Sequence, residues 1–414
     1  MNSSLSTLTP APGSAESVLS QQPKPKKNLI IDTDLFSDVD DAGALLLAST
    51  SPHINLLGVL INKPSTYSVL AASAIVSYYT THSHSHSQNS QNKAKAIPIP
   101  IGVFRHPTDD GSVIPLPNTT FLDVVSWHLG EFASKIAYQF GSASSPYQVK
   151  GEGANIPWER HAESAWPAVS LYRKLLGQAD PQSVTIASIG FLDNLSLLLD
   201  SSPDSFSPLT GRQLISQKVA ELVVMGGRYP EGKSWNFFGS DPDSAHHNGG
   251  QGLGLGLKGT ANVINNWPTP QRDGWKGKVV YVGDEVGRNV LTGGELVKKM
   301  GPKGDPVGRA YGYYAYGEAR PSWDPVAVLY AIGGLGEQLF KYDERYGYGR
   351  NWVDERDGSN KWVWDEETKN QFVLALKADN ETVAKEIDRL FLEGALSVAV
   401  ERAGPMGEQT GPKF

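Results

Sequence analysis

The sequence has no cysteine among its 414 residues. Disulfides, thiolate metal sites and cysteine nucleophiles are therefore excluded, and any bound metal must be held by oxygen or histidine ligands. It also lacks an apolar run of the roughly eighteen residues that a membrane span needs. Lys and Arg total 37 against 44 Asp and Glu, a net charge of −7, so no broad positive field exists to attract nucleic-acid phosphates. These absences predict a soluble, cytoplasmic protein that binds neither nucleic acid nor membrane.

Composition also predicts the limits of the folded part. Residues 1–27 are rich in Ser, Pro and Ala and lack the apolar core of a secretory signal, so we expect a disordered tail there. One domain is expected over 28–403, followed by a C-terminal tail at 404–414. Within the domain, the polar His-Ser repeat segment at 82–96 is better explained as a solvated loop than as a metal chelator. The Gly-rich segment at 249–259 lacks the glycine spacing of a phosphate-binding loop, which predicts a flexible loop.

Short apolar runs alternate with helix-like segments along the domain. NLIIDTD, INLLGVLIN and the IPIPIG run predict strands, and VDDAGALLLAST and STYSVLAASAIVSYYT predict the helices between them. Further on, AESAWPAVSLYRKLLGQ and LDNLSLLLD predict helices, and SVTIASIG, AELVVMGG and KVVYVG predict strands. This order implies parallel strands joined by right-handed crossovers. We predict an α/β fold with a single doubly wound, mostly parallel sheet flanked by helices.

An acidic cluster lies where the first predicted strand ends and the first helix begins. Five of the ten residues in DTDLFSDVDD, residues 32–41, are Asp. Helix capping accounts for Asp38 or Asp40, but not for Asp32 and Asp34 on the strand side. Carboxylates this close would raise one another's pKa unless a cation neutralised them. Open parallel sheets bind ligands at this edge, so the cluster predicts a hard divalent cation, Ca²⁺ or Mg²⁺, held by oxygen ligands.

Two other classes of protein use a similar Asp-x-Asp opening. An EF-hand is excluded, because the sixth position from the first Asp is Ser37 rather than Gly and the twelfth is Gly43 rather than Glu. A phosphatase of the haloacid dehalogenase type is an alternative, with Asp32 as nucleophile and Asp34 as acid. Phe36 stands where such enzymes usually carry Thr or Val.

Four blocks, in order along the chain, resemble the inosine-uridine-preferring nucleoside hydrolase family. The first block is DTD at 32–34 with DDA at 40–42, a longer-looped variant of the family signature. The second is SIGFLDN at 188–194, and the third is LVVMGG at 222–227 together with WNF at 235–237 and DP at 241–242. The fourth is SWDP at 322–325. The resemblance extends from about Asn28 to about Gly334. It implies Ca²⁺-dependent hydrolysis of the N-glycosidic bond of ribonucleosides to free base and ribose.

Carried over residue by residue, the resemblance assigns Ca²⁺ to the carboxylates of Asp34, Asp41 and Asp324 and to the main-chain carbonyl of Ile189. A metal-bound water has a lowered pKa, and an adjacent carboxylate can accept its proton. Asp34 is therefore the candidate catalytic base, and Asp38 is the alternative base if Asp34 serves only as a metal ligand.

The resemblance also implies which residues contact the substrate. Asp40, Asn62 and Asn236 are expected to contact the ribose. Trp323 stands where many family members have a His. Purine-preferring members resemble this chain in having a Trp at that position. An indole is not a useful acid at neutral pH, but it can stack on a purine and raise the basicity of that ring. We therefore expect a preference for purine nucleosides, in nucleoside catabolism and purine salvage.

Two departures from the family pattern leave a second hypothesis open. Ser234 replaces the Glu that precedes Phe-Asn in the family, and the segment from Gly227 to Asn236 is too short for a further Asn. A catalytically weak or repurposed member that binds calcium and a ligand is the alternative to an active hydrolase. The expected partner in either case is a small-molecule nucleoside, and a homo-oligomeric assembly is left open.

Overall fold

The computed structural model describes most of the expected domain. The described residues are 25–36, 38–63, 65–80, 99–105, 131–141, 165–238, 255–336 and 338–403. The polar segment predicted as a loop at 82–96 and the tail predicted at 404–414 lie outside them. Lys27 begins the first strand, so the N-terminal tail predicted through residue 27 is too long at its end. No helix among the described residues is long and apolar enough to cross a membrane.

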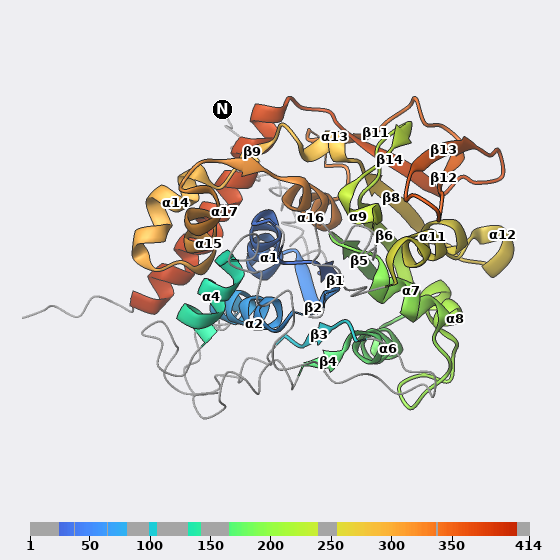
Figure 1. The fold of residues 1–414 in the computed structure, drawn as a ribbon, viewed down its shortest axis with the longest axis horizontal. Helices are drawn as coiled ribbons and strands as arrows, with labels where there is room; N and C mark the ends of the chain where they lie inside the picture. The colour runs from blue at the N-terminus through green and yellow to red at the C-terminus, as the bar shows by residue number, and fades with distance from the viewer. Residues whose placement is uncertain are drawn as a thin grey trace, which may run out of the picture.

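A nine-stranded sheet lies at the centre of the fold (Figure 1). The strands are β1 (Lys27–Thr33), β2 (Ile54–Ile61), β3 (Ile101–Val103), β4 (Trp166–Pro167), β5 (Val184–Ser188), β6 (Val219–Met225), β8 (Lys278–Val282), β11 (Phe340–Tyr342) and β14 (Gln371–Leu376). Their order is β11-β14-β8-β6-β5-β1-β2-β3-β4, and only the pairing of β11 with β14 is antiparallel. The predicted α/β class with a mostly parallel sheet is confirmed.

Helices cover both faces of this sheet, as Figure 1 shows. One face carries α1 (Asp40–Thr50), α2 (Thr66–Thr80), α4 (Glu131–Gly141), α14 (Gly294–Met300), α15 (Pro306–Ala315), α16 (Trp323–Gly333) and α17 (Asn380–Ala403). The other face carries α6 (Ala168–Gln178), α7 (Asp193–Asp200), α8 (Gly211–Lys218) and α11 (Gly256–Asn266). Strands covered on both faces are apolar throughout. In β1, Leu29 and Ile31 pack into one core and Ile30 into the other.

Shorter elements complete the described part of the fold. They are β7 (Glu231–Gly232), β9 (Leu291–Thr292), β10 (Arg320–Pro321), β12 (Gly349–Val353), β13 (Asn360–Trp364), α9 (Trp235–Phe238), α12 (Pro270–Asp273), α13 (Asp284–Gly287) and the 3-10 helix η2 (Gly301–Lys303). Strands β12, β13 and β7 form a small antiparallel sheet, and β9 pairs with β10.

Two sequence predictions differ from the observed elements. The helix expected from residue 162 begins only at Ala168, because the residue before a proline avoids helical geometry, and Trp166 and Pro167 instead pair with β3. The described end of the segment predicted as a flexible loop at 249–259 is helical: Gly256 to Gly259 begin α11. A side chain at Gly259 would meet the Asp193 carboxylate at 3.0 Å, so glycine lets α11 approach α7 closely.

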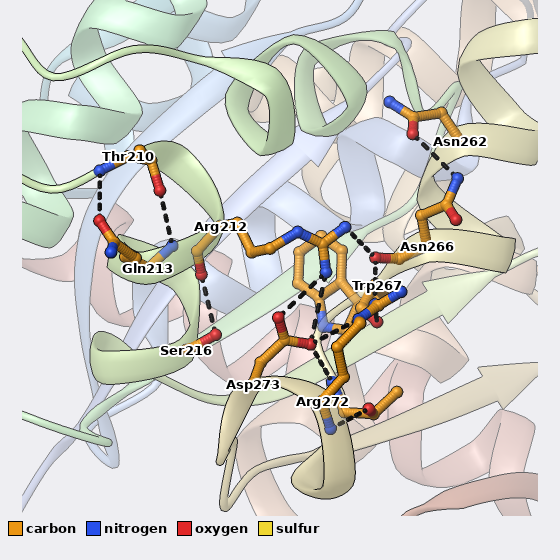
Figure 2. A network of polar contacts seen from close by, with 10 residues as sticks. Thr210, Arg212, Gln213, Ser216, Asn262, Asn266, Trp267, Arg272 and Asp273 are labelled. Carbon is orange, nitrogen blue, oxygen red and sulfur yellow. Dashed lines mark hydrogen bonds and ion pairs between the residues drawn. The ribbon is translucent and has the colours of Figure 1, made fainter.

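Polar contacts fix the connections on the second face. Figure 2 shows that Arg212 of α8 binds the carboxylate of Asp273 at 3.2 Å and donates to the carbonyl of Asn266 at 2.7 Å. Thr210 and Gln213 form a reciprocal capping box at the start of α8. These contacts hold α8, α11 and α12 together beside the sheet.

The direction of winding reverses between β1 and β5. From β1 the chain continues to β2 and β3 on one side, and from β5 it continues to β6 on the other. The loops that leave β1 and β5 therefore diverge at the carboxyl edge of the sheet. Open α/β sheets bind their ligands in the crevice at such a switch point.

Candidate active site

A cavity of about 300 Å³ lies at this switch point. Its walls come from the segments that follow β1 and β5, from the end of β6, and from the first turns of α9, α13 and α16. The lining residues are Asp34, Asp38, Asp40, Ile189, Met225, Ser234, Trp235, Asn236, Asp284, Trp323 and Asp324. Segments far apart in the sequence thus form one acidic pocket with an aromatic rim.

Most of the residues expected from the sequence meet in this cavity. Those in its lining are Asp34, Asp40, Ile189, Asn236, Trp323 and Asp324. Asp41 is fully buried and adjoins them: carboxylate oxygens of Asp38, Asp40 and Asp41 lie within 4.8 Å of one another. Asn62 is also buried but is not part of the lining.

Two helix N-termini position the carboxylates. Asp40 and Asp41 form the first turn of α1, and Asp324 lies in the first turn of α16. The main-chain N–H of Asp324 donates to Asp40 Oδ2 at 3.0 Å, and the hydroxyl of Thr33 donates to Asp41 Oδ1. The positive end of a helix dipole favours carboxylates at these positions. The first turns of α1 and α16 therefore converge and bring their acids together.

These favourable contacts do not neutralise the cluster. Burial, reinforced by the neighbouring carboxylates, raises the pKa of Asp40, Asp41 and Asp324 well above the usual range. Asp41 Oδ2 is buried and has no hydrogen-bond partner among the described residues. Buried polar atoms in folded proteins are normally satisfied. An oxygen-only donor set with an unsatisfied carboxylate oxygen fits a hard cation such as Ca²⁺.

Asp38, expected from the sequence as a helix cap or as an alternative proton acceptor, belongs to the site. The N-cap of α1 is Val39, and no side chain caps this helix, so the capping explanation for Asp38 and Asp40 is wrong. Asp38 instead lines the cavity. Burial and the charge of Asp34 raise the pKa of Asp38 to about 6. Asp38 lies in the segment between β1 and α1.

Asp32 belongs to a separate buried network behind the cavity. Its carboxylate accepts hydrogen bonds from Tyr172 Oη at 2.8 Å, Asn62 Nδ2 at 2.8 Å and Asn194 Nδ2 at 3.1 Å. Burial raises the pKa of Asp32 to about 7 in spite of these three donors. A nucleophile in this position would not reach a substrate, which argues against the phosphatase alternative. Asn62, expected to contact a sugar, here orients Asp32.

Gly190 allows a close backbone approach in the site. A Cβ atom there would lie 2.5 Å from the main-chain nitrogen of Asp34 and 2.8 Å from Asp34 Oδ1. The preceding residue, Ile189, donates its N–H to the carbonyl of Asp32 at 2.7 Å, which continues the β1 to β5 ladder. Glycine is therefore required for Ile189 and Asp34 to face the same cavity.

The rim of the cavity is aromatic. Trp323 is half-buried, and its indole N–H donates to the main-chain carbonyl of Asp284 at 2.8 Å, which fixes the orientation of the ring. Trp235, 40% exposed, lies on α9 beside Asn236. The amide of Asn236 donates to the carbonyl of Met225 at 3.0 Å. A flat, polarisable ligand group would fit this end of the pocket.

A buried lysine, Lys63, also belongs to the site. Its ammonium lies 3.7 Å from Asp34 Oδ2, and its side chain is only 4% exposed. Burial lowers the pKa of Lys63, while Asp34, Asp41 and Asp38 oppose this effect. Lys63 is not among the residues expected from the sequence, although the residue before it, Asn62, is. A lysine directly after an apolar strand, at the edge that carries the acids, was the available signal.

Comparisons with known proteins agree with this geometry. The sequence model of the family described as inosine-uridine preferring nucleoside hydrolase matches residues 29–385. A search among curated proteins finds no significant sequence match. Solved structures extend the comparison to the fold, because they match nearly the whole chain at low sequence identity.

Three of these structures illustrate the range of relatives. An inosine-guanosine nucleoside hydrolase has a TM-score of 0.54 and 18% identity, covering 90% of this chain and 98% of that one. The inosine-uridine preferring nucleoside hydrolase from Bacillus anthracis has a TM-score of 0.51 and 14% identity, covering 90% and 99%. The type III effector protein XopQ, in complex with adenosine diphosphate ribose, has a TM-score of 0.55 and 12% identity, covering 91% and 95%.

The close approach at Gly190 gives a test of the site. Gly190→Ala should lower the free energy of unfolding by about 2 kcal/mol, because the added methyl group overpacks the Asp34 backbone. It should also weaken calcium binding at least tenfold, since Asp34 must move. Gly333→Ala is the control, because nothing lies within 4 Å of a Cβ atom there. Urea unfolding and calcium titration measure both effects, and equal behaviour of the two variants would contradict the geometry.

The buried carboxylates predict a pH dependence for the protein in chelator. The pKa of Asp32 is about 7 in the folded state against an ordinary 3.8. Between these values the folded state binds more protons than the unfolded state, so stability should fall as pH rises from about 4 to about 7. For Asp32 the full effect is on the order of 4 kcal/mol. Urea unfolding across this range measures it, and Asp32→Asn should flatten the slope. Stability that is constant or rises with pH would contradict the prediction.

Proposed function

This chain belongs to the inosine-uridine preferring nucleoside hydrolase family, and we propose that it hydrolyses the N-glycosidic bond of purine ribonucleosides with the help of bound Ca²⁺. The products are free base and ribose. One observation carries this proposal: Asp34, Asp40 and Asp324 meet Ile189 and Trp323 around a single cavity at the switch point of the sheet. Acids for a cation and an aromatic surface for a base are thus present in the same pocket.

The cation would be held by the carboxylates of Asp34, Asp41 and Asp324 and by the main-chain carbonyl of Ile189. The unsatisfied Asp41 Oδ2 supports this assignment. A bound Ca²⁺ would supply a water of lowered pKa in a fixed orientation. Burial of the carboxylates in a pocket with few competing donors would make their charge more effective than in water.

Asp34 would accept a proton from the attacking water. The water oxygen forms a bond to C1′ of the ribose while the C1′–N bond breaks, and the bonding electrons pass to the base. Lys63 Nζ, 3.7 Å from Asp34 Oδ2, would help to hold this carboxylate in place. Asp40, held by the N–H of Asp324, would accept a hydrogen bond from a ribose hydroxyl and orient the sugar.

Trp323 would act on the departing base by stacking. Its indole N–H already donates to the Asp284 carbonyl, so Trp323 has no proton to offer the base. A stacked aromatic surface can stabilise the positive charge of a protonated purine. The proton on the base nitrogen would then come from solvent. This arrangement favours purines over uridine, because a purine ring stacks and accepts a proton more readily.

A second function is favoured by one feature of the cavity. Ser234 lines it where the family pattern has Glu, and Asn236 directs its amide to Met225, so ribose has fewer ready contacts. A member that binds a ligand with little turnover would show this pattern. The fold is shared with the effector XopQ, solved with adenosine diphosphate ribose. Binding of that compound without release of base would favour this second function.

Release of base from a nucleoside panel tests the main proposal. Purified protein should liberate base and ribose from inosine, adenosine or guanosine in calcium, and chelator should abolish the reaction. Asp34→Asn should reduce turnover at least a thousandfold, because it removes a ligand and the proton acceptor together. Asp180→Asn, at an exposed position, is the matched control. A wild-type protein that binds a nucleoside in calcium but releases no base would contradict the hydrolase assignment.

Trp323→Ala tests the proposed role of stacking. Stacking contributes about 1–3 kcal/mol per base, so kcat on a purine nucleoside should fall about ten- to a hundredfold. kcat should fall by more than KM rises, because the interaction grows as charge moves onto the ring. Trp364→Ala, at a 64% exposed position on β13, is the control. Unchanged calcium affinity would show that Asp324 is intact. Unchanged purine turnover, or a wild-type preference for uridine, would contradict this role.

A further inference from the structure

Lys63 occupies an unusual environment for a lysine. It follows β2 at the carboxyl edge of the sheet, and only 4% of its side chain is exposed. Lysine is almost never fully buried unless it is paired. Here the carboxylate partner is Asp34, with Nζ to Oδ2 at 3.7 Å. The pairing therefore involves one of the carboxylates assigned to the divalent cation.

Two aromatic rings complete the environment of the ammonium. Lys63 Nζ lies 5.1 Å from the centre of the Phe36 ring and 4.6 Å from that of Phe191. Phe36 follows β1 in the acidic loop, and Phe191 follows Ile189 after β5. Aromatic faces attract a cation, and they do so more strongly when water is excluded. Residues that follow β1, β2 and β5 thus surround the amine with aromatic faces and a carboxylate. Such surroundings stabilise a charged amine rather than a neutral one.

The ammonium group of Lys63 interacts with several carboxylates of the acidic site, not with Asp34 alone. Burial lowers the pKa of Lys63, and the charges of Asp34, Asp41 and Asp38 oppose this effect. Charge pairs in a poorly solvated pocket interact far more strongly than in water. The same three carboxylates would otherwise repel one another. Lys63 therefore offsets part of the negative charge that a divalent cation would neutralise.

We propose that Lys63 is a built-in counter-ion of the site. It stabilises the carboxylates when the divalent cation is absent and weakens the binding of that cation by repulsion when it is present. The protein consequently remains folded without its metal, and calcium exchanges readily with solution. This inference rests on the proposed function only in so far as the site binds a divalent cation.

The test compares Lys63→Met, which keeps an apolar stem for the two rings, with the wild type at pH 8. Calcium titration by calorimetry should show binding at least tenfold tighter in the variant, about 1.4 kcal/mol. Thermal unfolding in chelator should show a melting temperature lower by about 3 °C or more. Added calcium should remove that difference. Lys174→Met is the matched control, because Lys174 Nζ lies 4.3 Å from the Trp166 ring centre and is not part of the acidic cluster found among the described residues.

The outcomes separate this inference from the proposed function. Wild-type protein that binds no calcium at millimolar concentration would sink the proposed function. Wild-type binding with unchanged affinity and unchanged stability in Lys63→Met would overturn the role of Lys63 alone. A variant that folds only in calcium would support that role. If Lys63→Met is unfolded in every condition, the double variant Lys63→Met with Asp34→Asn distinguishes the two explanations. Folding of the double variant without calcium would support the counter-ion role of Lys63. Failure of the double variant to fold would show that Lys63 has a packing role instead.

Discussion

The repulsion among buried carboxylates is the constraint on which this structure depends. Asp34, Asp38, Asp40, Asp41 and Asp324 all lie at the point where β1 and β5 diverge. In a pocket shielded from water, each charge raises the pKa of the others. A fold that only needed to be stable would not place five acids there. Much of the rest of the site consists of groups that offset the repulsion among these carboxylates.

Groups of several kinds offset the negative charge of these carboxylates. The first turns of α1 and α16 supply fixed dipoles, and the N–H of Asp324 satisfies one oxygen of Asp40. Lys63 supplies a full charge on a side chain. These contributions still leave Asp41 Oδ2 without a partner among the described residues. The remaining deficit is the part that an exchangeable cation would fill, so stability and ligand binding are coupled at this site.

The fold class follows from short-range patterns, because apolar runs predicted the strands. Acids at a strand-to-helix junction predicted a cluster at 32–41, whereas the resemblance to the family singled out the individual residues of that cluster and most of the other residues of the cavity. The contacts of Asp32 with Tyr172 and of Lys63 with Phe191 join segments more than a hundred residues apart. No local pattern encodes such pairs. For the same reason Asn62 was assigned to a ribose, although its amide faces Asp32.

The two acids of the Asp-x-Asp pair show how position within one strand end separates two roles. Asp32 is still within β1, where the ladder to β5 holds it against Asn194 and Tyr172, and three donors surround its carboxylate. Asp34 lies just beyond the strand, where the chain is free to turn into the cavity, and Gly190 leaves space for that turn. The first acid is enclosed by neutral donors, and the second meets a cation and other acids. Of these two acids only Asp34 lines the cavity, where a ligand could reach its carboxylate.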